Sequence, residues 1–291
     1  MDKDPLFSVL IANYNNGCYL QETIDSVLVQ NYGNWEVIIV DDKSTDNSFK
    51  IYDNYKNDSR FHVYFNEENM GTGYTKRRCV EMARGEICGF LDPDDVLVGT
   101  NVFEEMVQTH LAHLYVSLVY SDMYMTDVNL NVVSEWLGRD VPEGSSALEF
   151  RDWPFSHFAT FKKEYYLKTE GVNAAMQRAV DYDLYYKLEE VGSVKHINHF
   201  FYKYRNTPNS ISLNEKKPLA HVWHVYACVE AMRRRGLRDE SLMLFPLESD
   251  MREQYANGYK RACNTKTYRI GEFVTLPLRL FRKVLGKESA K

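Results

Sequence analysis

The chain has 291 residues, of which 44% are hydrophobic and 26% charged, the composition of a globular protein that buries a sizeable core. Its five cysteines are scattered and never form a C-x-x-C pair, which argues against a disulfide framework or a zinc site and favours a reducing compartment. The net charge of −6 combines an acidic body with a basic segment at 252–291, which has 10 basic and 3 acidic residues, so a nucleic-acid-binding protein is not expected.

The first hundred residues alternate strand-like and helix-like segments. Short apolar runs rich in β-branched residues predict strands at 7–11, 35–40, 61–65 and 87–91. Apolar positions at helical spacing predict helices at 20–30, 44–55 and 75–83, the second of them capped by Ser44-Thr45-Asp46. This alternation predicts an α/β fold with a Rossmann-like, mostly parallel sheet and helices on both faces.

Polar clusters follow three of these strands. Ligands of parallel sheets bind beyond the carboxyl ends of the strands, so the clusters are expected on one rim. Turn-forming residues also end strands where no ligand binds, and for any single cluster that alternative stays open. Three clusters together favour a binding site: Asn13-Tyr14-Asn15, Asp41-Asp42 and Asp92-Pro93-Asp94-Asp95.

Beyond residue 100 the pattern is weaker. Residues 116–120 predict a strand that leads into Ser121-Asp122, and a helix starts near Tyr165. Asp181 and Asp183 precede an amphipathic helix at 184–190, and the pattern after about residue 215 is helical. We therefore expect a domain at 1–214, with halves at 1–120 and 121–214, followed by a helical extension at 215–291.

The Asp92-Pro93-Asp94 triplet is a candidate metal site. Two carboxylates that flank one residue at a strand end can approach one hard cation, and such oxygen ligands suit Mn²⁺ or Mg²⁺. The cation would bridge phosphate oxygens as a Lewis acid. The D-x-D pattern is common by chance, and Asp95 is equally suited to cap a helix. The position of the triplet at the end of a central strand is what favours the metal site.

Four segments resemble, in order and spacing, the successive motifs of family 2 glycosyltransferases: FSVLIANYNN, VIIVDDKSTD, NMGTGYTKRRCVEMARGEICGFLDPDD and AVDYDLYYKL. The resemblance covers about residues 5–212. It implies a GT-A fold for residues 1–214, with a nucleotide-sugar-binding half and an acceptor-side half. It also implies an inverting transfer of a sugar from a nucleoside diphosphate to a hydroxyl.

By position, the resemblance assigns the donor site. Ala12, Asn13 and Tyr14 correspond to the loop that packs against the nucleotide base. Asp42 is similar to the aspartate that binds the base, commonly uracil, so the expected donor is a UDP-sugar. A tyrosine face stacks on a base, and a carboxylate accepts from an imide N–H. For Tyr14 the alternative is a core aromatic.

The acidic residues divide into metal, donor and structural roles. Asp92 resembles the ribose contact, and Asp94 resembles the ligand of Mn²⁺ or Mg²⁺. For Asp41 we expect a buried capping role outside the site.

Asp181 resembles the catalytic base of the family. Inversion in one displacement needs a base on the face opposite the leaving group. The family often has an acid immediately before this residue, where this chain has Val180. Asp183 follows two residues later and points away if the helix has begun, so Asp181 is favoured.

Four further positions depart from the family pattern or stay open. Lys76 stands where an arginine is usual, which keeps the charge but loses the bidentate geometry. Arg205 is retained in YKYRNTPNSIS and is assigned to the diphosphate, with a surface salt bridge as the alternative. Thr207 stands where histidine is frequent. His157 lies towards the acceptor side, and its assignment to the core or to the site stays open.

Two other functions compete with a glycosyltransferase as interpretations of this sequence. A nucleotidyltransferase would carry a Gly-rich, Arg/Lys-containing signature after the first strand, where this chain has ANYNNGCYL. A non-catalytic nucleotide-sugar-binding module is disfavoured because all four candidate aspartates are present. The expected partners are a nucleotide-sugar donor and a carbohydrate or lipid-linked saccharide acceptor, in surface polysaccharide or glycan assembly.

The C-terminal tail suggests a membrane contact. No run of 18 apolar residues occurs and no signal segment precedes the first strand, so we expect a cytoplasmic protein. Residues 273–284 form an apolar stripe beside cations, a pattern typical of an interfacial helix on the inner face of the cell membrane. Pro277 would interrupt that helix, and docking of the stripe on the protein itself is the alternative. The stripe and its cations are Phe273, Leu276, Leu280, Val284, Arg279, Arg282, Lys283 and Lys287.

Overall fold

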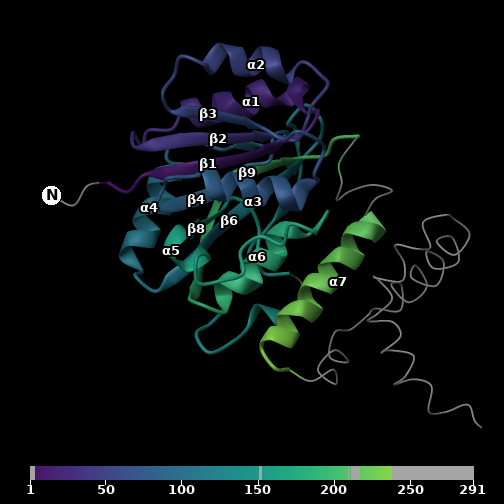
Figure 1. Cartoon of the computed structure of the whole chain (residues 1–291). Helices are drawn as coiled ribbons and strands as arrows, with labels where there is room; N and C mark the ends of the chain where they lie inside the picture. Colours follow the sequence, from purple (N-terminus) through teal and green to yellow (C-terminus); the bar gives the residue numbers. More distant parts are fainter. Residues whose placement is uncertain (1–3, 151–152, 209, 211–216, 238–291) are drawn as a thin grey trace, which may run out of the picture.

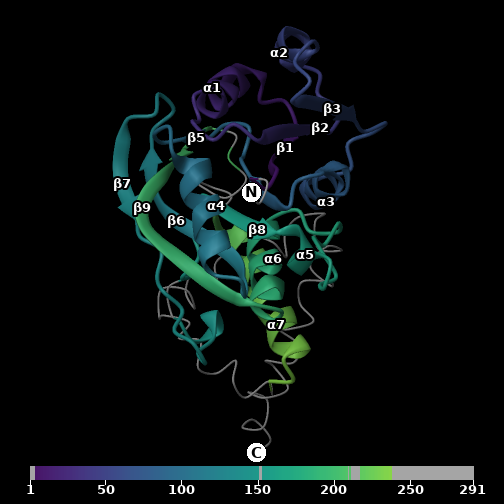
Figure 2. The same cartoon turned by 90° about the vertical axis from the view of Figure 1, so that its left-hand side faces the viewer.

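The structure is a computed structural model that describes residues 4–150, 153–208, 210 and 217–237. In this part of the chain one nine-stranded sheet has the order β3-β2-β1-β4-β8-β6-β9-β5, and β7 pairs with β6. Figure 2 shows β9 as a long strand beside β6. The strands are β1 (Phe7–Asn13), β2 (Trp35–Asp41), β3 (Phe61–Phe65), β4 (Ile87–Phe90), β5 (Val96–Leu97), β6 (Val116–Thr126), β7 (Val132–Trp136), β8 (Ala159–Lys162) and β9 (Ser193–Arg205).

Helices cover both faces of the sheet, as the sequence predicts (Figure 1). Strand side chains alternate between the faces: Val9 and Ile11 of β1 pack on one side, and Leu10 packs on the other. One face is covered by α1 (Gly17–Leu28), α2 (Ser48–Tyr55) and α4 (Val102–Ala112). The other is covered by α3 (Thr72–Met82), α5 (Lys163–Tyr166), α6 (Val180–Glu189) and α7 (Lys217–Arg234).

The two halves of the sheet differ in strand direction. Strands β1 to β4 pair in parallel, as predicted. The second half is mixed, because β8 runs antiparallel to both β4 and β6 while β9 runs parallel to β6. β7 and β9 were not predicted. β7 is mostly exposed, and much of β9 is half-buried and rich in Lys and His, so neither shows the apolar run or strict alternation that identifies a strand.

Helix α7, at the start of the segment where the sequence predicts a helical extension, packs on α6. Ala227, Cys228 and Ala231 of α7 share a core cluster with Leu184 of α6. None of the helices in the described part of the chain is long and apolar enough to cross a membrane. The amphipathic stripe at 273–284 lies outside the described residues.

Candidate active site

At the end of β1, the three loop residues have different exposures. Asn13 is fully buried, and its amide donates to the side-chain oxygens of Asp41 and Tyr52 at 3.1 and 2.7 Å. Ala12 is half-buried, whereas Tyr14 is 47% exposed. The Tyr14 ring is therefore accessible to a ligand and is not a core aromatic, while the Asn13 side chain is committed to the interior.

At the end of β2, Asp41 and Asp42 are buried and hydrogen-bonded. Asp41 accepts from the Ser44 amide at 2.7 Å and from the Tyr52 hydroxyl at 2.6 Å, which confirms its structural role. Asp42 accepts from the Asn66 side chain at 2.6 Å and from the backbone amides of Met70 and Gly71, each at 2.8 Å. Asp42 thereby fixes the segment that leads into α3.

Asn66 is a residue of this rim that the sequence reasoning missed. It directly follows β3, and it also donates to the Thr75 hydroxyl at 3.1 Å. Asn66 follows the end of a strand, as Asn13 does, so the expectation that ligands bind beyond strand ends could have identified it.

At the end of β4, three carboxyl groups crowd together. Asp95 is buried and accepts from the Tyr202 hydroxyl and from the Arg205 amide, both at 2.7 Å. Asp94 accepts a long 3.4 Å bond from Thr207. Burial and the charge of Asp92 raise the pKa of Asp94 to about 6, and burial with both neighbouring carboxylates raises the pKa of Asp95 well above its usual range.

Lys76 joins this rim to the N-terminus of α6. Its ammonium lies 2.9 Å from Asp92 and 2.8 and 3.0 Å from the two carboxylate oxygens of Asp181. Burial lowers the pKa of Lys76, but the two carboxylates raise it overall. Burial likewise would raise the pKa of Asp92, and Lys76 and then His157 lower it. The structure thus unites three predicted site residues from β4, α3 and α6.

The first turn of α6 separates the two candidate bases. The Asp181 side chain is 17% exposed and faces Lys76. Asp183 is buried and accepts from Lys187 at 2.7 Å, which confirms that it points away from the site.

All three guanidinium nitrogens of Arg205 donate hydrogen bonds to other residues of the chain. It donates to the carbonyl oxygen of Asp94 at 2.6 Å, to that of Val128 at 2.9 Å and to the carboxylate of Glu22 at 2.5 Å. Its guanidinium also lies 4.7 Å from the centre of the Tyr19 ring. Because the side chain is 3% exposed, it is a buried brace for the Asp94 loop rather than a surface salt bridge.

His157 lies at the site. Its Nδ1 is 3.5 Å from the Tyr185 hydroxyl, and its ring centre is 5.3 Å from that of Tyr202. Burial lowers the pKa of His157, against the opposing charges of Asp181 and Asp92. The Tyr202 hydroxyl donates to Asp95, so the His157 ring is one side chain away from the carboxyl groups that follow β4.

The carboxylate oxygens at the end of β4 suit a divalent cation that is bound together with a phosphate group. In the described residues no group of three or more His, Cys, Asp and Glu side chains could hold a metal alone. Mg²⁺ is typically held by one or two carboxylates plus substrate phosphates, which demands less of the protein. Asp94 has a raised pKa and a weak hydrogen-bond partner, so a cation there would relieve its repulsion with Asp92. The residues therefore fit Mn²⁺ or Mg²⁺ at Asp94.

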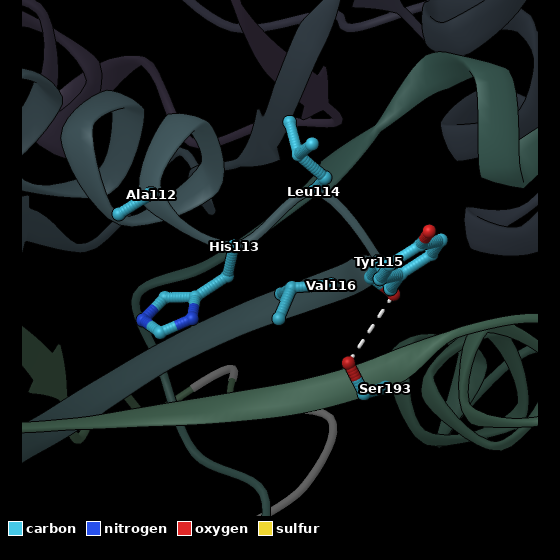
Figure 3. Close-up of a pocket in the computed structure, with 6 residues that line it drawn as sticks. All are labelled: Ala112, His113, Leu114, Tyr115, Val116 and Ser193. Atoms are coloured by element: carbon cyan, nitrogen blue, oxygen red, sulfur yellow. Dashed lines mark hydrogen bonds between the residues drawn. The ribbon is translucent and has the colours of Figure 1, made fainter.

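A separate hollow of about 360 Å³ lies elsewhere (Figure 3). It includes Val116 and Ser193, the first residues of β6 and β9, whereas Arg205 at the site ends β9. Tyr115 on its wall is 80% exposed. The hollow is thus at the opposite end of these strands, and the candidate site residues do not line it.

Comparison with known proteins gives consistent relatives. The model of the family "Glycosyl transferase family 2" matches residues 8–180. Chondroitin synthase of Escherichia coli is 34% identical over 199 residues, which are 68% of this chain and 28% of that protein. Hyaluronan synthase of Pasteurella multocida is 31% identical over 215 residues, or 69% of this chain and 20% of that protein. The chain thus spans less than a third of the length of these curated relatives.

Solved structures share the fold. S. aureus TarS 1–349 in complex with UDP-GlcNAc aligns with a TM-score of 0.63 at 18% identity, covering 78% of this chain and 66% of that one. The mannosyltransferase PcManGT from Pyrobaculum calidifontis, in complex with GDP-Man and Mn²⁺, aligns with a TM-score of 0.56 at 16% identity, covering 99% and 89%. These likenesses confirm the GT-A fold. Since the family model matches more than half of the sequence, the chain belongs to glycosyltransferase family 2.

Proposed function

We propose that the chain is an inverting glycosyltransferase that transfers a sugar from a UDP-sugar to an acceptor hydroxyl. The observation that carries the proposal is the bridge of Lys76 between Asp92 at the end of β4 and Asp181 at the start of α6. The bridge puts a donor-side carboxylate and a candidate base within reach of one ammonium. A single displacement needs such groups on opposite sides of one reacting carbon.

The donor side is assigned to the ends of β1, β2 and β4. The exposed Tyr14 ring stacks on the base, and Ala12 and Asn13 shape the loop beneath it through their backbone. Asp42 already accepts three hydrogen bonds. A carboxylate offers about four acceptor positions, which leaves one for the imide N–H of uracil. Asp92 accepts from the ribose, and Arg205 braces the Asp94 loop.

The base is assigned to Asp181. It takes the proton of the acceptor hydroxyl as the oxygen attacks the anomeric carbon, and the nucleoside diphosphate leaves from the opposite face. We place His157 near this site, where its ring lies next to the ring of Tyr202. Asp94 would hold the divalent cation, which would supply positive charge to neutralise the leaving diphosphate.

The setting is inferred from the relatives and from the sequence. Two relatives are named as synthases of chondroitin and hyaluronan, and one neighbour holds UDP-GlcNAc. We infer a role in surface polysaccharide or glycan assembly, with a carbohydrate or lipid-linked saccharide as acceptor. We assign donor binding to residues 1–120, acceptor binding to 121–214 and a cytoplasmic location, with membrane contact through the tail at 273–284.

The proposal is tested with a panel of UDP- and GDP-sugars, Mn²⁺ and saccharide acceptors. We expect acceptor-dependent release of UDP and a product whose anomeric configuration, read by NMR, is opposite to that of the donor. Retention of configuration would contradict the single displacement. A sugar nucleotide that raises the Tm without any UDP release would identify a binding module, and pyrophosphate release would identify a nucleotidyltransferase.

A further inference from the structure

The hydrogen-bonding capacity of Lys76 is already used. An ammonium group has three N–H donors, and three carboxylate oxygens lie 2.8 to 3.0 Å from this one. The side chain is 5% exposed, and the ring of Phe90 is 5.1 Å away. A donor phosphate can therefore bind Lys76 only if one of its carboxylates is released. This geometry makes a simple role as a diphosphate ligand unfavourable.

Lys76 is the cation that contacts both carboxylates in the described residues. Asp181 has both oxygens on Lys76, and the preceding residue, Val180, is buried and apolar. Arg205 instead uses its guanidinium on Asp94, Val128 and Glu22. Within the described part of the chain, Lys76 is therefore the group that fixes where the Asp181 carboxylate lies relative to Asp92.

We propose that Lys76 is a positioning residue for the base, acting by holding Asp181 in register with the donor-side carboxylate Asp92. The inference rests on the proposed function, since it takes Asp181 as the base. Lysine suits this task because its three donors point in separate directions, towards two carboxylates on different elements. An arginine fork would favour one bidentate partner instead. The departure from arginine at this position thus gives one cation two carboxylate partners.

The proposal predicts where the catalytic loss will fall. Lys76→Met removes the restraint on Asp181, so kcat at saturating donor should fall by about 10²-fold, the size expected for a catalytic group displaced by about 1 Å. In an Asp181→Asn background the restraint has no base to position. Adding Lys76→Met there should therefore lower kcat no further, and the two substitutions should be strongly non-additive.

Lys187→Met is a matched control. Lys187 is as buried as Lys76, with 5% of its side chain exposed, and it pairs with Asp183 at 2.7 Å on the same helix as Asp181. Both variants remove a buried lysine from a carboxylate, and only Lys76 contacts the site. We expect Lys187→Met to lower the Tm while kcat per folded molecule stays within about threefold of the wild type. Lys76→Gln, which keeps one side-chain donor group, replaces Lys76→Met if the latter does not fold.

The full-length chain is assayed with Mn²⁺ and the UDP-sugar found active in the panel. kcat is measured for the wild type, both single variants and the double variant, and donor Kd is measured without acceptor. Multiplicative kcat losses, or an unchanged kcat with an equal rise in donor Kd in both backgrounds, would overturn the inference and make Lys76 a donor ligand. A wild-type kcat in Asp181→Asn would instead overturn the base assignment in the proposed function.

Discussion

Two acidic strand ends of the sheet have the same residue types but different surroundings. After β2, Asp41 and Asp42 each accept several hydrogen bonds, from Ser44, Tyr52 and other neighbours. After β4, Asp92, Asp94 and Asp95 lie close together, and burial together with the neighbouring carboxylates raises the pKa of Asp94 and Asp95. A carboxylate with several donors holds a fold together, whereas crowded carboxylates repel one another, and a bound cation relieves that repulsion.

The surroundings of a carboxylate therefore distinguish a structural role from a role in the site, even where the residue type is the same. Removing the Asp41 carboxylate should therefore damage stability, and removing the Asp94 carboxylate should damage catalysis. Substitutions at Asp94, Asp181 and Asp41 test this contrast.

Asp94→Ala should abolish transfer, because no other group is assigned to hold the cation that neutralises the diphosphate. The Tm in EDTA should not fall below that of the wild type, since Asp94 has one long hydrogen bond. Nucleoside diphosphate release is measured over a range of Mn²⁺ concentrations. Activity that persists in Asp94→Ala, or in the wild type with excess EDTA, would disprove the metal assignment.

Asp181→Asn should lower kcat by about 10²- to 10⁴-fold, the range typical of a lost general base. Asparagine is nearly isosteric, but it cannot take the acceptor proton at neutral pH. Donor Kd, measured by calorimetry with Mn²⁺, should change little. Loss of donor binding in this variant would move Asp181 into the nucleotide pocket. Asp183→Asn, which alters the buried partner of Lys187, is the control that should retain kcat.

The sequence predicts the first half of the fold better than the second. The sequence predicts the strand at 61–65 with its observed bounds and β1, β2 and β4 within one or two residues, because continuous apolar runs mark them. The strand predicted at 116–120 extends to Thr126 in the structure. β9 escaped detection because Lys195, His196 and Lys203 interrupt its apolar pattern. Its pairing with β6 is a tertiary preference that local composition does not encode.

The sequence predicts which residues form the site, but it does not predict which of them contact one another. The family resemblance supplied Asp92, Asp94 and Asp181, and strand ends supplied the rim. The contact between Lys76 and Asp181 spans 105 residues, and no spacing rule reveals it. Arg205 is assigned to the diphosphate by the family resemblance of YKYRNTPNSIS, while in the structure its guanidinium donates to Asp94, Val128 and Glu22.

Asp41→Asn should destabilise the protein by about 1–3 kcal/mol, the cost of leaving buried groups unsatisfied. The new amide NH₂ would face the Tyr52 hydroxyl or the Ser44 amide, both of which now donate to the carboxylate. Urea unfolding should show a lower midpoint with an unchanged m value. The kcat of the folded fraction should match the wild type, and a large loss of kcat at unchanged stability would place Asp41 in the site.

Asp94→Asn in EDTA should have the opposite, smaller effect and should depend on pH. The pKa of Asp94 is about 6 in the folded chain, against about 3.9 for an unfolded aspartate. Because the folded value is the higher one, the contribution of this group to stability is complete below about pH 3.9 and is lost as the pH rises through about 6. The wild type therefore carries an unfavourable charge at pH 7.5 that asparagine lacks.

The Asp94→Asn variant should accordingly melt a few degrees above the wild type at pH 7.5 in EDTA, and this advantage should shrink towards pH 5. The effect is modest because Asp94 is partly exposed and solvent screens its charge. Mn²⁺ added together with UDP should raise the Tm of the wild type more than that of the variant, which removes or reverses the difference between them. A variant that is less stable than the wild type at pH 7.5 without metal would mean that Asp94, like Asp41, is a scaffold carboxylate. The distinction between the two strand ends would then fail.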